Sequence, residues 1–210
     1  MTRLVVVGTD TDVGKTVFAA GLCQALGASY WKPVQAGLAD GTDTLTVTEL
    51  AGLSDERIIP EIYRLNTPAS PHVSAEIDGI ELDTSLLAPP QVDGSLVIEG
   101  AGGLLVPLTR SILYADVIAH WQLPVVLVGR TALGAINHAL LSLEALRARH
   151  IPIIGMAFVG DEVPDTERTI CEMGAVKRLG RLPFVDPLTP DTLAAVFAEQ
   201  FTLSDFTDFT

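Results

Sequence analysis

The sequence has few charged residues, few aromatic residues and no long apolar run, and each shortage excludes a class of protein. Charged residues make up 19% of the 210 residues and aromatic residues 6%. Basic residues are the scarcer sign, 13 against 26 acidic ones, for a formal net charge of -13. A protein that binds nucleic acid or an anionic membrane needs a basic patch, so we expect neither partner. No stretch approaches the roughly 18 apolar residues of a transmembrane helix, and the N-terminus lacks a signal-peptide core.

Cysteine is also scarce, and neither Cys23 nor Cys171 belongs to a metal-ligand spacing. We therefore expect buried free thiols and a reducing, cytoplasmic location. Hydrophobic residues make up 48% of the chain, which suffices for one sizeable core without disulfides. The length suits a single domain over residues 1–210, with the polar tail at 202–210 expected to fray.

Short apolar runs alternate with helical patterns along the chain. Continuous β-branched or apolar runs predict buried strands at 4–7, 29–31, 96–98, 125–128, 153–159 and 179–182. Helical patterns occupy 15–26, 44–51, 114–121, 137–149, 165–173 and 191–201. This alternation predicts an α/β fold, a doubly wound and mostly parallel sheet with helices on both faces. Ligands bind such sheets at the carboxyl ends of the strands, which directs attention to the segments that follow them.

The first predicted strand runs into the segment Gly8-Thr-Asp-Thr-Asp-Val-Gly-Lys-Thr16, followed by a predicted helix. This is a P-loop in its required context of strand, loop and helix. Free N–H groups and the positive end of the helix dipole suit a triphosphate. Gly14 allows close backbone approach, Lys15 would bridge the β- and γ-phosphates, and the Thr16 hydroxyl would bind Mg²⁺.

The loop departs from the commonest spacing, because its first glycine is Gly8 and not Thr9. Regulatory ATPase switches of the partitioning and metallochaperone kind have a similar layout. They carry a second lysine where this chain has Asp10. That difference disfavours a regulatory switch, which remains the alternative function.

Two acidic residues and a second lysine follow predicted strand ends. Glu99 ends an apolar run and precedes a segment of small residues that we expect to turn, and Asp43 precedes a helix. Either carboxylate could hold the Mg²⁺ of a P-loop, although Asp43 could equally serve the helix dipole. Lys32 follows the short strand at 29–31, and Pro33 would aim it toward the ligand crevice. Only three lysines occur in the chain, and two of them fall at such crevice positions.

Taken together, the motifs resemble the dethiobiotin synthetase family. They are the phosphate loop, Trp31-Lys-Pro-Val-Gln-Ala-Gly37, Glu99-Gly-Ala-Gly-Gly103 and Leu133-Gly-Ala-Ile-Asn-His138, with weaker matches at 68–72 and 180–183. The resemblance implies an ATP- and Mg²⁺-dependent ligase that closes a ureido ring from 7,8-diaminopelargonate and CO2. In such a ligase a carbamate is phosphorylated to a carbamic–phosphoric anhydride before the ring closes. It also implies a homodimer with active sites at the interface.

The resemblance assigns site residues by position. Catalysis would involve Lys32, Lys15 and Thr11. The metal would be held by Thr16, Asp43 and Glu99. The nucleotide site would comprise those three with Asp12, Val13, Gly14, Lys15, Val17, Gly100, Ala101, Gly102, Gly160 and Pro183. The substrate would meet Thr11, Lys32 and Ala36, and the helix start at Gly134, Ala135 and Asn137.

Three positions depart from the family pattern. Ala36 replaces a serine that is common beside the substrate, and Asp12 replaces a longer glutamate. Val159 stands where an asparagine often reads the adenine base, so the base preference is open. A glutamine-hydrolysing amidoligase would need a further domain that 210 residues do not provide. A degenerate nucleotide-binding module without catalysis is disfavoured because the phosphate loop, both lysines and both carboxylates are all present.

Overall fold

The computed structural model describes residues 1–39 and 41–208. The strands are β1 (Arg3–Gly8), β2 (Ser29–Trp31), β3 (Val34–Ala36), β4 (Ile58–Ile59), β5 (Tyr63–Leu65), β6 (Leu96–Gly103), β7 (Val125–Arg130), β8 (Ile153–Val159) and β9 (Arg178–Leu182). The α-helices are α1 (Lys15–Leu26), α2 (Asp43–Ala51), α3 (Pro71–Asp78), α4 (Tyr114–Trp121), α5 (Ala135–Ala148), α6 (Pro164–Met173), α7 (Pro190–Gln200) and α8 (Ser204–Thr207). Every strand and helix expected from the sequence is present.

A seven-stranded sheet forms the centre of the molecule, in the order β4-β2-β6-β1-β7-β8-β9. All of its described pairings are parallel, which confirms the expected α/β fold. A second, two-stranded sheet pairs β3 with β5 in parallel. Because parallel strands point the same way, the segments that follow β1, β2, β6, β7 and β8 gather at one edge.

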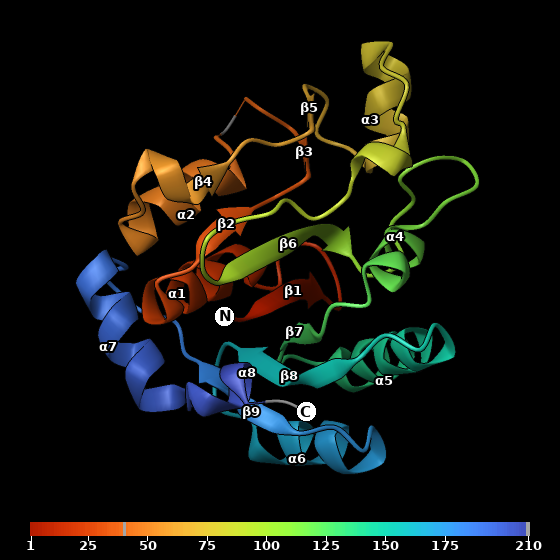
Figure 1. Cartoon of the computed structure of the whole chain (residues 1–210). Coiled ribbons are helices and arrows are strands. Elements are labelled where there is room, and N and C mark those ends of the chain that lie inside the picture. The colour runs from red at the N-terminus through yellow and green to blue at the C-terminus, as the bar shows by residue number, and fades with distance from the viewer. Residues whose placement is uncertain (40, 209–210) are drawn as a thin grey trace.

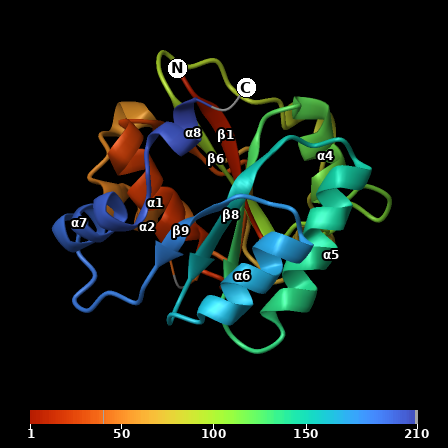
Figure 2. The ribbon, with the colours of Figure 1, turned by 90° about the horizontal axis from the view of Figure 1, so that it is seen from below.

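Helices cover both faces of the sheet (Figures 1 and 2). One face packs against α1, α2 and α7 through an apolar cluster that includes Phe18, Val47 and Leu193. The other face packs against α4, α5 and α6 through a cluster that includes Ile118, Leu143 and Ile170. Burial on both faces explains why the central strands are continuously apolar in sequence. None of the helices in the described residues has the length and apolar character needed to span a bilayer.

The structure corrects the expectation that the C-terminal tail frays. Residues 204–207 form α8, and Phe206 is fully buried. Its ring lies 6.2 Å from the ring of Phe18, with Phe197 and Phe201 beside it. Burial of a large aromatic side chain outweighs the polar composition of the segment. The expectation for residues 209 and 210 lies outside the described residues.

Other differences concern short elements. The strands β3, β4 and β5 and the helix α3 were not expected, because two- or three-residue strands leave no readable pattern and α3 has few apolar residues. Helix α5 begins at Ala135 and is capped by Gly134, so Asn137 is not the cap residue. Strand β6 continues to Gly103 past the expected turn, because Gly103 pairs with Gly8 after a register shift.

Candidate active site

The phosphate loop connects β1 to α1, and its conformation requires glycine at one position. Gly14 has φ 93 and caps the helix, a left-handed conformation that glycine adopts without strain. A Cβ placed on Gly14 would lie 2.8 Å from Cγ1 of Val159. Val13 is buried beside it and Val17 is half-buried on α1. The strand β8 therefore packs directly against the loop, at the position where the family pattern has a base-reading residue.

The early glycine of the loop has a packing reason. The Lys15 ammonium folds back and donates a hydrogen bond to the Asp10 carbonyl at 3.0 Å. A Cβ on Gly8 would lie 2.9 Å from Nζ of Lys15 and 2.7 Å from that carbonyl oxygen. Gly8 thus provides the space in which the Lys15 side chain lies, although it stands one residue away from the usual position.

Asp12 adopts an unusual backbone conformation, with φ 55. Its carbonyl accepts hydrogen bonds from the guanidinium of Arg130 at the end of β7, with Nε at 3.1 Å and Nη2 as a second donor. Left-handed conformations of non-glycine residues persist only where their surroundings hold them. Arg130 supplies that support, which cannot be read from the sequence because the two residues lie 118 positions apart.

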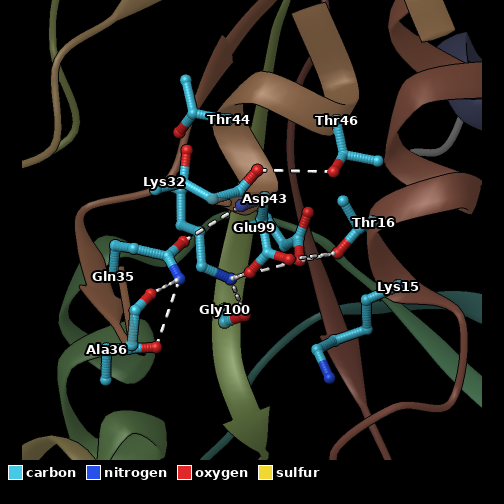
Figure 3. A network of polar contacts seen from close by, with 12 residues as sticks. Lys15, Thr16, Lys32, Gln35, Ala36, Asp43, Thr44, Thr46, Glu99 and Gly100 are labelled. Carbon is cyan, nitrogen blue, oxygen red and sulfur yellow. Dashed lines mark hydrogen bonds and ion pairs between the residues drawn. The ribbon is translucent and has the colours of Figure 1, made fainter. Parts of the chain in front are cut away.

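Four polar side chains meet where β2, β6, α1 and α2 converge (Figure 3). The Thr16 hydroxyl lies 3.0 Å from Oδ1 of Asp43 and 2.8 Å from Oε1 of Glu99. The Lys32 ammonium lies 2.6 Å from Oδ2 of Asp43 and 3.2 Å from Oε1 of Glu99. It also donates to the carbonyl of Gly100 at 3.4 Å. The structure therefore brings together three expected metal ligands and the expected catalytic lysine.

Burial and neighbouring charges shift the pKa values of these groups in opposite directions. Burial lowers the pKa of Lys32, but the carboxylates of Glu99 and Asp43 more than offset this, so its pKa is raised and the ammonium stays charged. Burial raises the pKa of Asp43, but the Lys32 charge outweighs it, so that carboxyl's pKa is lowered. For Lys15 the effect of burial is larger than the effect of the negative charge of Glu99, so the pKa of its ammonium is lowered. Its ammonium points away from the carboxylates (Figure 3).

Besides Arg130, two residues of the site carry no recognisable signal in the sequence. The Tyr30 hydroxyl donates to Oε2 of Glu99 at 2.8 Å, with both side chains fully buried. Gln35 accepts from the backbone N–H of Asp43 at 3.3 Å and donates to the carbonyls of Ala36 and Gly37, both at 3.2 Å. Strand register explains the Tyr30 contact: Tyr30 pairs with Val97, which puts it on the same sheet face as Glu99, two residues further along.

A cavity of about 560 Å³ opens beside these groups. Lys32, Asp43 and Ala36 line it, together with loop residues and the 68–71 segment; the remaining lining residues are Thr11, Asp12, Gln35, Gly37, Ala39, Gly41, Ala101, Gly102 and Val106. A second cavity, of about 350 Å³, lies between the phosphate loop and α5 and shares Thr11 and Val106 with the first. Thr11 therefore lies at the junction of the two cavities.

The other expected site residues fall into two places. Gly160 and Pro183 follow the adjacent strands β8 and β9, and the Gly160 carbonyl accepts from Arg181 at 3.0 Å. Gly134, Ala135 and Asn137 lie at the start of α5, where Gly134 and Asn137 are exposed and Ala135 is half-buried. These three line neither of the two cavities, although His138 and Leu141 of the same helix line the second. In one chain, the start of α5 therefore does not line the cavity beside Lys32.

Comparison with solved structures identifies the fold. The MinC:MinD cell division complex of Aquifex aeolicus matches with a TM-score of 0.56 at 12% identity, covering 95% of each chain. A ParA family ATPase of Chlorobium tepidum matches with a TM-score of 0.56 at 11% identity, covering 94% of this chain and 97% of that one. The fold is therefore that of P-loop ATPases, and at these identities the likeness says nothing further.

Comparison with protein families and curated sequences identifies the chain more closely. A family model described as an AAA domain matches residues 2–192. A protein of Rhizorhabdus wittichii named ATP-dependent dethiobiotin synthetase BioD is 63% identical, covering 98% of this chain and 99% of that protein. Proteins of the same name from Nitrobacter hamburgensis and Agrobacterium fabrum are both 60% identical, covering 98% and 97% of this chain and 97% and 96% of theirs. At this identity over nearly the full length, the chain belongs to the dethiobiotin synthetase family, ATP-dependent ligases that form carbon–nitrogen bonds in biotin biosynthesis.

Proposed function

We propose that the chain closes the ureido ring of dethiobiotin from 7,8-diaminopelargonate and CO2, with ATP converted to ADP and phosphate. One amine takes up CO2 to give a carbamate, whose oxygen attacks the γ-phosphate of ATP. The second amine attacks the resulting carbamic–phosphoric anhydride at its carbonyl, closes the five-membered ring and expels phosphate. A carbamate is a poor electrophile because its oxygen leaves badly, and phosphorylation supplies the better leaving group.

The observation that carries this proposal is the position of Lys32. Lys32 is buried, its ammonium pairs with Asp43 and Glu99, and it lines the 560 Å³ cavity together with Thr11 and Asp12 of the phosphate loop. Phosphoryl transfer needs fixed positive charge and positioning more than it needs covalent help from the protein. In this proposal Lys32 neutralises the carbamate and the migrating phosphoryl group, and Lys15 holds the β- and γ-phosphates. Thr11, at the junction of the two cavities, faces the reacting groups.

Thr16, Asp43 and Glu99 fit a magnesium ion. Their oxygens are hard ligands, and the Thr16 hydroxyl lies within 3.0 Å of one oxygen from each carboxylate. Among residues 1–39 and 41–208, no three His, Cys, Asp or Glu side chains gather to hold a metal by themselves. Two carboxylates and a hydroxyl leave positions for phosphate oxygens and water, which Mg²⁺ commonly keeps. When bound, Mg²⁺ offsets the charge of the β- and γ-phosphates.

The phosphates would lie on the loop from Asp12 to Val17, with the glycine-rich end of β6 at Gly100, Ala101 and Gly102 beside them. Gly160 and Pro183, at the ends of β8 and β9, would border the base. Val159 offers no hydrogen-bonding side chain there, so we expect weak base selectivity. Competition among ATP, CTP and GTP measures it directly.

The diamine would occupy the larger cavity, beside Lys32 and Ala36, and its carboxylate would meet the free N–H groups at the start of α5. Because Gly134, Ala135 and Asn137 line neither cavity in one chain, we propose that a second copy presents them. Leu105 and Leu141 line the second cavity and are exposed, and Leu133, just before α5, is fully exposed. A homodimer in which these leucines are buried brings the two halves of the site together.

One assay tests the proposal. The protein is incubated with 7,8-diaminopelargonate, bicarbonate, ATP and Mg²⁺, and phosphate release and product mass are measured. Phosphate release that depends on the diamine, with a product of dethiobiotin mass, is the expected result. Lys15→Ala controls for contaminating phosphatases and should lower the rate by about 10²-fold or more, as loss of one preorganised stabilising charge does. Release that ignores the diamine favours a regulatory ATPase.

A further inference from the structure

Glu99 is the most completely buried charged group of the site, and its two oxygens have different neighbours. Oε1 accepts from Thr16 at 2.8 Å and lies 3.2 Å from the Lys32 ammonium. Oε2 accepts from the Tyr30 hydroxyl at 2.8 Å. Glu99 and Tyr30 both have no exposed surface, so bulk water does not reach Oε2 while the tyrosine is in place.

We propose that Tyr30 is a positioning residue. Its hydroxyl donates a hydrogen bond to Oε2 of Glu99 and so keeps Oε1 facing Thr16, Lys32 and the divalent cation. The inference rests on the proposed function, because it takes Glu99 to be a metal ligand. It adds a residue outside the phosphate loop and the expected ligand set, on the neighbouring strand β2.

The packing around Tyr30 holds its ring, and therefore its hydroxyl, in one position. It belongs to the three-residue strand β2, between β4 and β6. Its ring packs in the cluster beneath α1, with Val97 level on the next strand. A ring fixed in this way presents its hydroxyl at one place. Partners that orient a ligating carboxylate from behind commonly account for about 10–100-fold in metal affinity.

The choice of oxygen has a consequence for metal selectivity. Mg²⁺ demands near-ideal octahedral geometry, whereas Ca²⁺ accepts carboxylates through one or both oxygens. With Oε2 occupied by Tyr30, Glu99 is restricted to binding through Oε1. Loss of the hydroxyl frees Oε2 and lets the carboxylate turn, which should harm Mg²⁺ binding more than Ca²⁺ binding.

The chain provides a matched control. Tyr114 is also almost fully buried and lies near Glu99, which helps burial to raise its pKa. Its hydroxyl has no hydrogen-bond partner among the described residues. Tyr30→Phe and Tyr114→Phe therefore delete the same atom from two buried rings, and only the first deletion removes a contact to Glu99.

The experiment measures metal binding directly. Mn²⁺ is titrated into the protein with ADP present, free Mn²⁺ is followed by electron paramagnetic resonance, and Mg²⁺ and Ca²⁺ are added as competitors. Tyr30→Phe should raise the Kd for Mg²⁺ by about 10–100-fold and that for Ca²⁺ by less. Tyr114→Phe should stay within about twofold of the wild type. Metal-free ADP binding and thermal melting show that each variant is folded, and excess Mg²⁺ should restore the Tyr30→Phe turnover.

The outcomes distinguish the proposed metal site at Glu99 from the proposed positioning role of Tyr30. If Glu99→Gln binds Mn²⁺ like the wild type, the proposed metal site itself is wrong. If Glu99→Gln loses Mn²⁺ while Tyr30→Phe keeps wild-type Mg²⁺ affinity, only the role of Tyr30 is overturned. Equal losses for Mg²⁺ and Ca²⁺ in Tyr30→Phe would overturn its selection of one oxygen.

Discussion

Lys32 illustrates how one residue can serve both folding and chemistry. Its ammonium compensates the fully buried Glu99 and the partly exposed Asp43, and the same charge faces the cavity proposed for the substrate. Removing one partner of a buried ion pair leaves the other uncompensated. A loss of activity on mutation must therefore be distinguished from a loss of folded protein.

Replacing Lys32 with alanine should lower diamine-dependent turnover by about 10²-fold or more, while ADP affinity changes little. The free energy of unfolding of the metal-free protein should fall by about 3–5 kcal/mol, since Glu99 loses its cation. Turnover is measured by phosphate release and stability by urea unfolding. Lys177→Ala is the control, because Lys177 pairs with Asp205 at the surface. Wild-type turnover in Lys32→Ala would refute the catalytic role.

The ion pair of Lys32 and Asp43 also predicts a pH dependence. Asp43 has a lowered pKa in the folded protein, so its stabilising contribution is complete above the ordinary value of about 3.9 and is lost as pH falls through the folded value. Lys32 has a raised pKa, so its contribution is complete below about 10.4 and is lost as pH rises through the folded value. Between these limits the pair should be intact.

Urea unfolding of the metal-free protein from pH 7 down to pH 3 tests the acid side. The wild type should lose stability below about pH 4 in excess of Asp43→Asn, and the two curves should converge as the carboxyl is protonated. A constant difference between the two proteins over that range would contradict the assignment of the shift to Asp43.

At the scale of elements, α7 and α8 depend on an aromatic cluster formed by Phe18, Phe197, Phe201 and Phe206. The rings of Phe197 and Phe201 stack at 4.5 Å, and α1 approaches α7 so closely that a Cβ on Gly21 would lie 2.4 Å from Phe197. These contacts fix α8 against α1, the helix that begins at the end of the phosphate loop. The C-terminal segment therefore packs against α1.

Phe206→Ala should lower the free energy of unfolding by about 3–5 kcal/mol, the usual range for a buried phenylalanine. Phe184→Ala is the control, since that side chain is exposed and should change stability by about 0.5 kcal/mol or less. Chemical denaturation measures both. A Phe206→Ala variant as stable as Phe184→Ala would show that α8 contributes nothing to the fold.

For the whole molecule, the decisive question is whether two copies complete one site. Leu141 is exposed on α5 beside the second cavity. Leu141→Asp should therefore weaken the proposed dimer and raise the KM for the diamine, because the start of α5 belongs to the partner's site. Leu45→Asp, on the exposed side of α2, is the control and should leave the dimer intact.

Sedimentation of the two variants over a range of concentrations, together with substrate titration, measures these effects. The dimer hypothesis expects dissociation and a raised KM to occur together in Leu141→Asp. A monomeric wild type with full activity would remove the basis for assigning Gly134, Ala135 and Asn137 to the substrate.

Local patterns in the sequence were enough to establish the α/β fold, the phosphate loop and the family resemblance. Continuous apolar runs are a local signal of strands buried on both faces, and Gly14, Lys15 and Thr16 stand at fixed spacing in one segment. The sequence also indicated Lys32, Asp43 and Glu99 as separate candidates. What it could not provide was their mutual distance, because they come from different elements.

How those candidates are held depends on the three-dimensional packing of the chain. The contacts of Tyr30 with Glu99 and of Arg130 with Asp12 depend on strand register and on the packing of distant segments. The burial of Phe206 likewise depends on residues far away in the chain, which is why a polar tail that looked unstructured forms a helix. Local sequence patterns report the period of an element, whereas side-chain contacts between elements are set by how the elements pack.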